Sequence, residues 1–438
     1  MCTALVYQKR RFLRRRRPEQ SEIVPNRCCV IYYKTKRADR SHIFKKGSKS
    51  CYDMSRQKKA KGGYFYMSEE MRKGKELPAV KDNKRLPAVD AIRGLAVIGM
   101  YIQHFALNRW NGFVSGNTMI LFMLCSGISY TIMAGKMLEK DADRKSLNMR
   151  VLVRSVFLDL AGYVLIMLNG PFAVVLTAYA MLYLLALPFV RLETKRLLFL
   201  SGIAFLVCPP LMLIGMSLFE DAAVLSDIAG GPLSALAWMP VFFMGMAVGR
   251  FNLHKVENAI RFIASGVIIL ILAKLVEVFV MPGVYNSYME WAASDPSIVN
   301  AEIDLYAMWP HNTQPVMWHM LFISTPQGGS TCELLVGTGG SLMLFGVLCL
   351  IGNKCGKLLR PFCNVGKLSL TLYVIQIVLG WALLSINTEW ALALMDIGSI
   401  PFGGILMAIV VILWSMVSIK FKCSPFESLM RKFEKKFT

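Results

Sequence analysis

Apolar stretches of about twenty residues recur along this chain from residue 86 to residue 419, and they constrain its fold more than any other feature. Each stretch is long enough to cross the ~30 Å hydrocarbon core of a bilayer as a helix. Hydrophobic residues make up 55% of the chain, which excludes a set of ordinary soluble domains. We predict an all-α, polytopic membrane helical bundle of about ten transmembrane helices. They cover residues 86–107, 114–135, 149–169, 172–190, 196–219, 232–250, 258–281, 331–352, 366–387 and 398–419.

Charges in the connecting segments indicate how these helices are oriented. With a cytoplasmic N-terminus, the inner segments are rich in Lys and Arg: residues 136–150, 191–195, 251–257, 353–365 and the C-terminal tail. The outer segments contain several acids and a single cationic residue, Arg109. These outer segments are residues 108–113, 170–171, 220–231, 282–330 and 388–397. Because the pattern follows the positive-inside rule, we predict that both termini are cytoplasmic.

The net charge of +22 comes mostly from the N-terminal residues, since residues 1–85 hold 25 of the 50 Lys and Arg residues. This segment has few apolar runs, so we predict that residues 1–84 form a basic, disordered cytoplasmic tail. A solvated tail near anionic lipid fits this composition better than a nucleic-acid-binding segment. Met67 offers an alternative start, with which residues 1–66 would not be native coding sequence.

The transmembrane domain is expected to occupy residues 85–421, with residues 422–438 as a separate tail. Within that tail, residues 425–437 place aromatic and aliphatic side chains on one helical face and Lys and Arg on the other. This pattern predicts an amphipathic helix on the inner leaflet.

The first apolar stretch, 86–107, carries three ionisable residues: Asp90, Arg93 and His104. Asp90 precedes Arg93 by three residues, and at about 100° per residue the eleven steps to His104 return to nearly the same helix face. Ionisable side chains within a membrane usually face a protein interior or a wet cavity. The sequence therefore predicts one polar stripe, with an ion pair near the cytoplasm and an imidazole about 16 Å further out.

Each residue of this stripe has a functional and a structural interpretation. Arg93, neutralised by Asp90, suits a cytoplasm-facing site for a phosphate-bearing donor, and it could equally snorkel to the membrane surface. His104 suits a general base for a hydroxyl or amine, and a lone intramembrane His is often a hydrogen-bonding bridge between helices. We take His104 as the candidate catalytic residue, with Asp90 and Arg93 in substrate binding.

Polar residues in other apolar stretches are further candidates for substrate binding. Ser126, next to Gly127, belongs to a small-residue surface that also favours close helix packing. Lys274 and Glu277, three residues apart, form either a buried structural ion pair or the lining of an outward cavity near His104. Gln376 adds hydrogen-bonding groups to the stretch 366–387.

The long outer segment 282–330 contains Trp, His and acidic residues but no Lys or Arg. This composition suits a carbohydrate or cationic acceptor, and an interfacial aromatic belt explains the Trp residues equally well. The sequence has no zinc-ligand spacing, nucleophile elbow, phosphate loop or Rossmann fingerprint, so we predict no metal.

Several of these segments resemble known families. RLPAVDAIRGLAVIGMYIQHF followed by LFMLCSGIS is similar to the opening of the transmembrane acyltransferase superfamily. Its members share an Arg-Gly in the first span, often a His eleven residues after the Arg, and a Phe…Ser-Gly pattern in the second. Other segments resemble the YeiB-like family of unassigned function and its bacterial heparan-α-glucosaminide N-acetyltransferase-like relatives. They are VLTAYAMLYLLALPF, FFMGMAVGR, TPQGGST, LRPFCNVGKLSLTLYVIQ and SPFESLMR, so the resemblance covers residues 85–431.

The chain also departs from its relatives. Trp110-Asn111-Gly112 is similar to the Trp-Asn-Gly of the animal lysosomal enzymes. Leu107 stands where those enzymes have a His, and Asn117 stands where they have an acid. Residues 326–329 read Pro-Gln-Gly-Gly where the bacterial relatives often have Pro-His-Ser-Gly. Heparan-type chemistry is therefore not implied.

The resemblance implies a multi-pass enzyme of the cell membrane, expected in a bacterium or archaeon. It would move an acyl group, acetyl in the first instance, from cytoplasmic acyl-CoA to an extracytoplasmic sugar or cell-envelope glycan. In that reading Arg93 serves the donor and His104 the chemistry. The alternative is a transporter or exporter of a small polar solute, in which the same stripe lines the substrate path. The expected partners are the bilayer, acyl-CoA and the acceptor, without nucleic acid.

Overall fold

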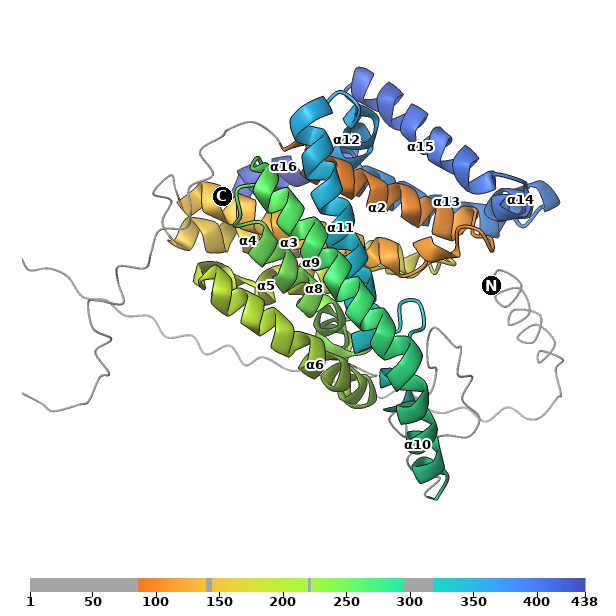
Figure 1. The fold of residues 1–438 in the computed structure, drawn as a ribbon. Coiled ribbons are helices and arrows are strands. Elements are labelled where there is room, and N and C mark those ends of the chain that lie inside the picture. Colours follow the sequence, from red (N-terminus) through yellow and green to blue (C-terminus); the bar gives the residue numbers. More distant parts are fainter. Residues whose placement is uncertain (1–85, 139–143, 220–221, 295–317, 438) are drawn as a thin grey trace, which may run out of the picture. The chain divides into compact units, whose positions relative to one another are not determined.

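The protein is described by a computed structural model that covers residues 86–138, 144–219, 222–294 and 318–437. All regular secondary structure in these ranges is helical (Figure 1). Six helices are long and apolar enough to cross a membrane, which confirms the prediction of an all-α polytopic membrane protein. They cover Gly112–Leu138, Thr194–Leu218, Val256–Trp291, Thr331–Cys355, Ser369–Ile386 and Gly403–Lys420. The predicted basic tail, 1–84, lies outside the described residues.

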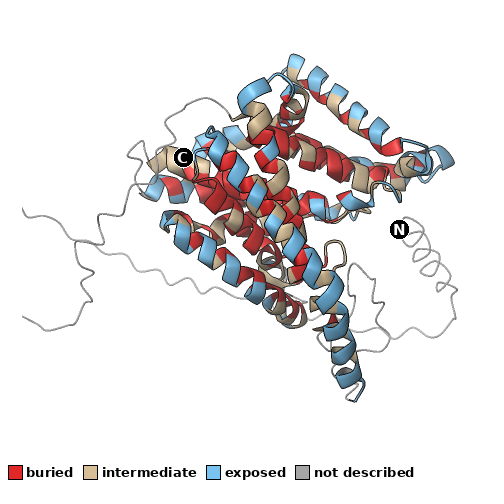
Figure 2. Ribbon diagram, viewed as in Figure 1, coloured by how far each residue is buried: buried red, intermediate tan, exposed pale blue. Residues whose placement is uncertain are grey.

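Helix α2 (Pro87–Phe105) lies among several helices that are distant in sequence. It begins at Pro87, where the missing N–H costs no helical hydrogen bond. Its neighbours include α3 (Asn117–Leu138), α11 (Thr331–Cys355), α12 (Arg360–Lys367), α13 (Ser369–Ile386) and α15 (Gly403–Lys420). Figure 2 shows α2 largely buried, whereas α15 is exposed along its outer face. Asp90 of α2 is therefore buried in the protein, and Arg93 and His104 are partly buried.

Glycine allows two of the closest helix contacts. A Cβ at Gly94 of α2 would lie 3.0 Å from the backbone nitrogen of Gly366 in α12. A Cβ at Gly127 of α3 would lie 2.8 Å from the backbone nitrogen of Met246 in α8 (Ala235–Val248). The prediction that the Ser126-Gly127 surface permits close packing is thus confirmed.

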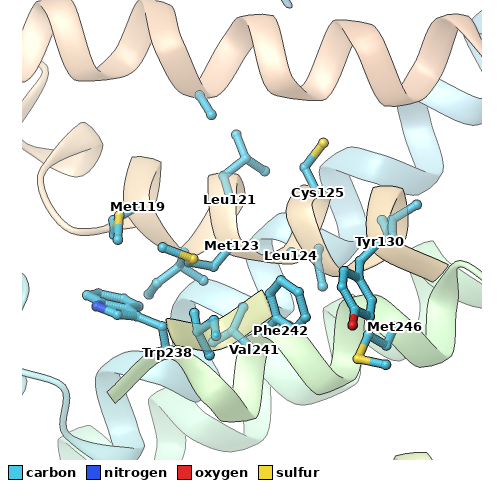
Figure 3. Packing of buried hydrophobic residues seen from close by; sticks show 14 of the residues in the cluster. Met119, Leu121, Met123, Leu124, Cys125, Tyr130, Trp238, Val241, Phe242 and Met246 are labelled. Carbon is cyan, nitrogen blue, oxygen red and sulfur yellow. The ribbon is translucent and has the colours of Figure 1, made fainter. Parts of the chain in front are cut away.

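The α3–α8 contact contains the largest buried side chains of the bundle. Figure 3 shows Met123, Leu124 and Tyr130 of α3 facing Trp238 and Phe242 of α8. Trp238, Tyr130 and Phe242 are fully buried. This packing fixes α3 relative to α8 and thereby holds the face of α3 that meets α2.

Two predicted spans, 172–190 and 232–250, form shorter helices than expected. The first appears as α5 (Leu176–Leu185) followed by the 3₁₀ turn η3 (Leu187–Arg191), and the second as α8. Their 10 and 14 residues rise about 15 and 21 Å at 1.5 Å per residue, less than a hydrocarbon core. Pro188 interrupts the first predicted span. The Gly-Gly-Pro sequence at 230–232 makes the helix of the second span begin later than predicted. The count of ten spans therefore stays a prediction.

The prediction that residues 282–330 form an outer loop is wrong for residues 282–293, which are helical. Helix α9 (Val256–Leu275) continues through a π-helical turn (Val276–Val280) into α10 (Met281–Ala293). Pro282 lacks the N–H that a continuous α-helix would use, and the π turn immediately before it accommodates this loss. The residues from 295 to 317, which include Trp309 and His311, lie outside the described residues.

The remaining helices are α4 (Arg144–Met167), α6 (Thr194–Leu218), α7 (Ala223–Ala229), α14 (Glu389–Met395) and α16 (Pro425–Phe437). Helix α16 packs against α4 and α13, with Phe426, Met430 and Phe433 against the core. Its apolar side is therefore used partly within the protein. A position on the inner leaflet stays a prediction.

Candidate functional site

Arg93 is held on the buried face of α2 by two neighbours. Its Nη1 lies 3.9 Å from Oδ1 of Asp90, the residue one turn earlier. Its Nη2 donates a hydrogen bond to the Ser129 hydroxyl of α3 at 2.5 Å. Asp90 is buried, with 6% of its surface exposed. The predicted pair thus forms within the bundle, so Arg93 does not simply snorkel to the surface.

Other polar side chains surround the Arg93 guanidinium, and they come from α3 and α5. Cys125, Tyr179 and Tyr183 interact with it electrostatically. The Tyr179 hydroxyl donates to the Tyr183 hydroxyl at 3.0 Å, and the two rings lie 4.9 Å apart. We call Asp90, Arg93, Cys125, Ser129, Tyr179 and Tyr183 the arginine cluster. It combines one guanidinium with several hydroxyl groups, a donor-rich surface suited to an anion.

Ser126 lies at the edge of this cluster. Its hydroxyl donates to the Phe122 carbonyl one turn earlier at 2.8 Å, and it lies near the Tyr179 hydroxyl. The structure therefore places Ser126 next to the arginine cluster. Its role in substrate binding stays a prediction.

The sequence reading missed Ser129, Tyr179 and Tyr183. Two tyrosines four residues apart in the apolar run LTAYAMLYLL share a helix face, and this spacing was an available signal. No local pattern links them to Arg93, because that contact requires α5 to pack beside α3 and α2. Identifying these three residues as neighbours of Arg93 therefore requires the tertiary structure.

His104 lies in the last turn of α2 and has very different surroundings. Its imidazole stacks on the ring of Phe172, with centroids 4.2 Å apart and planes inclined by 6°. The Nδ1 atom is buried and has no hydrogen-bond partner among the described residues. Phe172 in turn lies against Gly380 of α13. A positioned imidazole with an uncommitted ring nitrogen can accept or donate a proton.

Gln376 of α13 lies at the same level of the bundle as His104. The Tyr101 hydroxyl of α2 donates to the Leu372 carbonyl of α13 at 2.9 Å. The Phe172 ring that stacks on His104 also lies against Gly380, about one helical turn after Gln376 on α13. Gln376 is fully buried, and neither amide atom has a partner among the described residues.

Lys274 and Glu277 form an ion pair at 2.8 Å, with 51% and 23% of their side-chain surfaces exposed. They interact electrostatically with Cys332 at the start of α11. Within the described residues no contact joins this pair to His104, and the exposed Lys274 side chain does not fit a buried ion pair. A role for Lys274 and Glu277 in substrate binding stays a prediction.

Part of the predicted outer segment surrounds a carboxylate that the sequence reading missed. Glu333, in the first turn of α11, accepts backbone hydrogen bonds from Gln327 at 2.5 Å and Gly329 at 2.8 Å. The Ser330 hydroxyl caps the same helix by accepting from the Glu333 backbone at 3.2 Å. The Ser-x-x-Glu spacing at 330–333 was the signal for this cap. The Pro-Gln-Gly-Gly stretch is thus held by Glu333 just before α11 begins.

The Trp110-Asn111-Gly112 segment forms the turn that follows α2. The Asn111 side chain donates to the Ala106 carbonyl at 2.7 Å and accepts from the Asn108 backbone at 2.7 Å. Trp110 is 78% exposed, and the Arg109 guanidinium lies 4.6 Å from its ring centre. In this chain the segment closes the last turn of α2 rather than contributing an acid or base.

Two family models match the chain. Residues 85–275 match the model described as "Heparan-alpha-glucosaminide N-acetyltransferase, catalytic". Residues 305–436 match the model described as "Protein of unknown function (DUF418)". No curated protein matches the chain significantly. The arginine cluster and His104 lie within the first match, and Gln376 lies within the second. Residues 85–275 of this multi-pass membrane protein are therefore similar to the heparan-α-glucosaminide N-acetyltransferase catalytic family, and residues 305–436 are similar to the DUF418 family.

Proposed function

We propose that the protein is a membrane acyltransferase that uses acyl-CoA, with acetyl-CoA as the first donor to test. One observation carries the proposal: helix α2 presents a partly buried, partnered guanidinium and, eleven residues later, an imidazole with an uncommitted nitrogen. Coenzyme A carries its phosphates and its thioester at opposite ends of an extended arm. Two separated polar sites on one helix, about 16 Å apart, suit such a donor. The match to an acetyltransferase catalytic region supports the same chemistry.

In this proposal the arginine cluster binds the donor. Arg93 supplies charged N–H groups, and the hydroxyls of Ser129, Tyr179 and Tyr183 add neutral donors. Asp90 keeps the guanidinium oriented and lowers the net charge of the empty site, which limits the cost of burying it.

His104 acts in the proposed chemical step as a general base. The acceptor hydroxyl or amine attacks the thioester carbonyl, and the imidazole takes the acceptor proton. The carbon–sulfur bond then breaks and the thiolate leaves with the proton that the imidazole returns. The alternative is transient acylation of His104 itself, after which the acceptor attacks the acyl-imidazole. In both forms Gln376 is positioned to hydrogen-bond the acceptor near His104.

The proposed acceptor is an extracytoplasmic sugar or cell-envelope glycan, and the proposed location is the cell membrane of a bacterium or archaeon. The acidic and aromatic composition of residues 282–330 supports a carbohydrate or cationic acceptor on the outer side.

The test is transfer of labelled acetyl groups from acetyl-CoA by the protein in proteoliposomes. Wild type is compared with His104→Ala and Arg93→Ala, and with His254→Ala as an exposed histidine control. The proposal expects label transfer to a glycan that both site variants lose and the control retains. Uptake of labelled solute without any acyl transfer would instead identify a transporter. Transfer unaffected by His104→Ala would remove His104 from the chemistry.

A further inference from the structure

A second group of charged residues lies where α16 packs on α4. Arg150 and Arg154 are four residues apart and therefore share a face of α4. Arg150 Nη2 lies 3.4 Å from Oε2 of Glu434, and Arg154 Nε donates to Oε1 of the same carboxylate. Glu434 is 6% exposed, so the C-terminal helix inserts a buried carboxylate between two arginines.

The two arginines offer more hydrogen-bond donors than one carboxylate uses. Arg150 Nε is buried and lacks a partner among the described residues. Arg154 Nη1 contacts the thioether sulfur of Met133 at 3.0 Å, which is a weak acceptor. Two guanidinium groups also carry twice the positive charge that one carboxylate neutralises. A dianion with three or more oxygens would match these donors more fully than Glu434 does.

The two ends of α16 are held by different interactions. Near its start, Glu427 accepts hydrogen bonds from the Leu370 and Thr371 backbones, each at 3.0 Å, and so caps α13. Near its end, Glu434 pairs with the arginines and the Phe433 ring lies 5.6 Å from that of Phe157. The end of the helix can therefore be released while Glu427 keeps its start in place.

We propose that Arg150 and Arg154 form a binding site for a phosphate-bearing anion, and that Glu434 occupies this site as an internal substitute. Binding of the anion displaces Glu434 and releases the last turns of α16. The source of the phosphate is either a lipid headgroup or a free phosphate compound. The inference does not depend on acyl transfer, because anion binding and helix release are measured without turnover.

The helix that carries this site lies beside part of the arginine cluster. Helix α4 packs against α5, which carries Tyr179 and Tyr183. An anion that replaces Glu434 therefore changes the charge on a neighbouring helix of these tyrosines.

The experiment measures amide hydrogen exchange of α16 in nanodiscs. The neutral baseline is phosphatidylcholine, one arm adds phosphatidylglycerol to the bilayer, and another adds inorganic pyrophosphate in solution. We expect at least a 10-fold faster exchange of residues 431–437 in one or both arms, with residues 425–430 as the internal control. Sodium chloride at matched ionic strength should have no such effect.

Two variants make the result specific. Glu434→Gln should show fast exchange of 431–437 already in the neutral bilayer, and the double variant Arg150→Gln/Arg154→Gln should no longer respond to either phosphate source. The exposed Glu389→Gln should behave as wild type. The proposal is overturned if neither arm accelerates exchange in wild type, if sodium chloride acts equally, or if the double variant responds like wild type. The wild-type titration decides the matter even if a variant fails to fold.

Discussion

The two ends of α2 differ in how completely their polar groups are satisfied. At one end, Arg93 has a carboxylate, a hydroxyl and two tyrosines around it. At the other end, His104 has an aromatic ring on its face and a ring nitrogen without a partner among the described residues. The environment of Arg93 is that of a binding site whose polar groups are paired, whereas the environment of His104 leaves a reactive ring nitrogen available. A buried polar group without a partner is costly, so its retention points to a role beyond folding.

The comparison predicts that loss of His104 affects turnover and leaves stability nearly unchanged. Replacing His104 by Ala should lower acetyl transfer in proteoliposomes by about 10²- to 10⁴-fold, the usual contribution of a general base. Thermal unfolding in detergent should reflect only the loss of the ring stacking, about 0.5–1.5 kcal/mol, because the Nδ1 atom makes no hydrogen bond that the fold requires. A large loss of stability together with activity would show that His104 is a structural bridge.

Loss of Arg93 should lower stability as well as acetyl transfer. Arg93→Ala leaves Asp90 buried without its cation, so we expect a loss of about 3–5 kcal/mol in the free energy of unfolding. The double variant Asp90→Ala/Arg93→Ala should recover part of this loss, because it removes both charges together. Denaturant titration of the two variants measures the coupling. Equal stability of the single and double variants would contradict a tight pair.

A smaller effect is expected from Phe172, which stacks on His104. Phe172→Leu keeps apolar volume but removes the aromatic face, and such pairs contribute about 0.5–1.5 kcal/mol. Acetyl transfer should fall about 2- to 10-fold, while Phe251→Leu, which removes the aromatic pair with Phe262, serves as the matched aromatic control. An unchanged rate in Phe172→Leu would mean that stacking does not position the imidazole.

The smallest effect concerns the pH dependence of stability and the buried imidazole of His319. His319, in the 3₁₀ turn η5 (Trp318–Leu321), is 1% exposed, and burial lowers the pKa of its imidazole below the ordinary value. The unfolded chain therefore binds the proton more readily, and stability falls as pH drops below about 6.5. His319→Gln should flatten this acid limb in thermal unfolding. If the limb persists unchanged, another group causes it.

The two ends of α2 also show what the sequence can predict. The Asp90–Arg93 pair follows from helical spacing within one segment, and the structure confirms it. The residues that complete the cluster lie on α3 and α5, and only packing brings them to Arg93. Similarly, His104 was recognisable within its apolar stretch, whereas Phe172 reaches it from a different segment. Hydropathy located the helices. It did not predict where they end near Pro188 and Pro282, because average hydropathy does not depend on backbone hydrogen bonding.

The continuous helix formed by α9, the π turn and α10 has a consequence for the surrounding lipid. The helix extends over 36 residues, Val256–Trp291, and only 11% of the residues in its most apolar window are buried within the protein. Such a helix is about 54 Å long, against ~30 Å of hydrocarbon, and the usual tilt of up to about 40° does not absorb this difference. At least one end of the helix therefore projects beyond the hydrocarbon, and lipid rather than protein covers most of its apolar window.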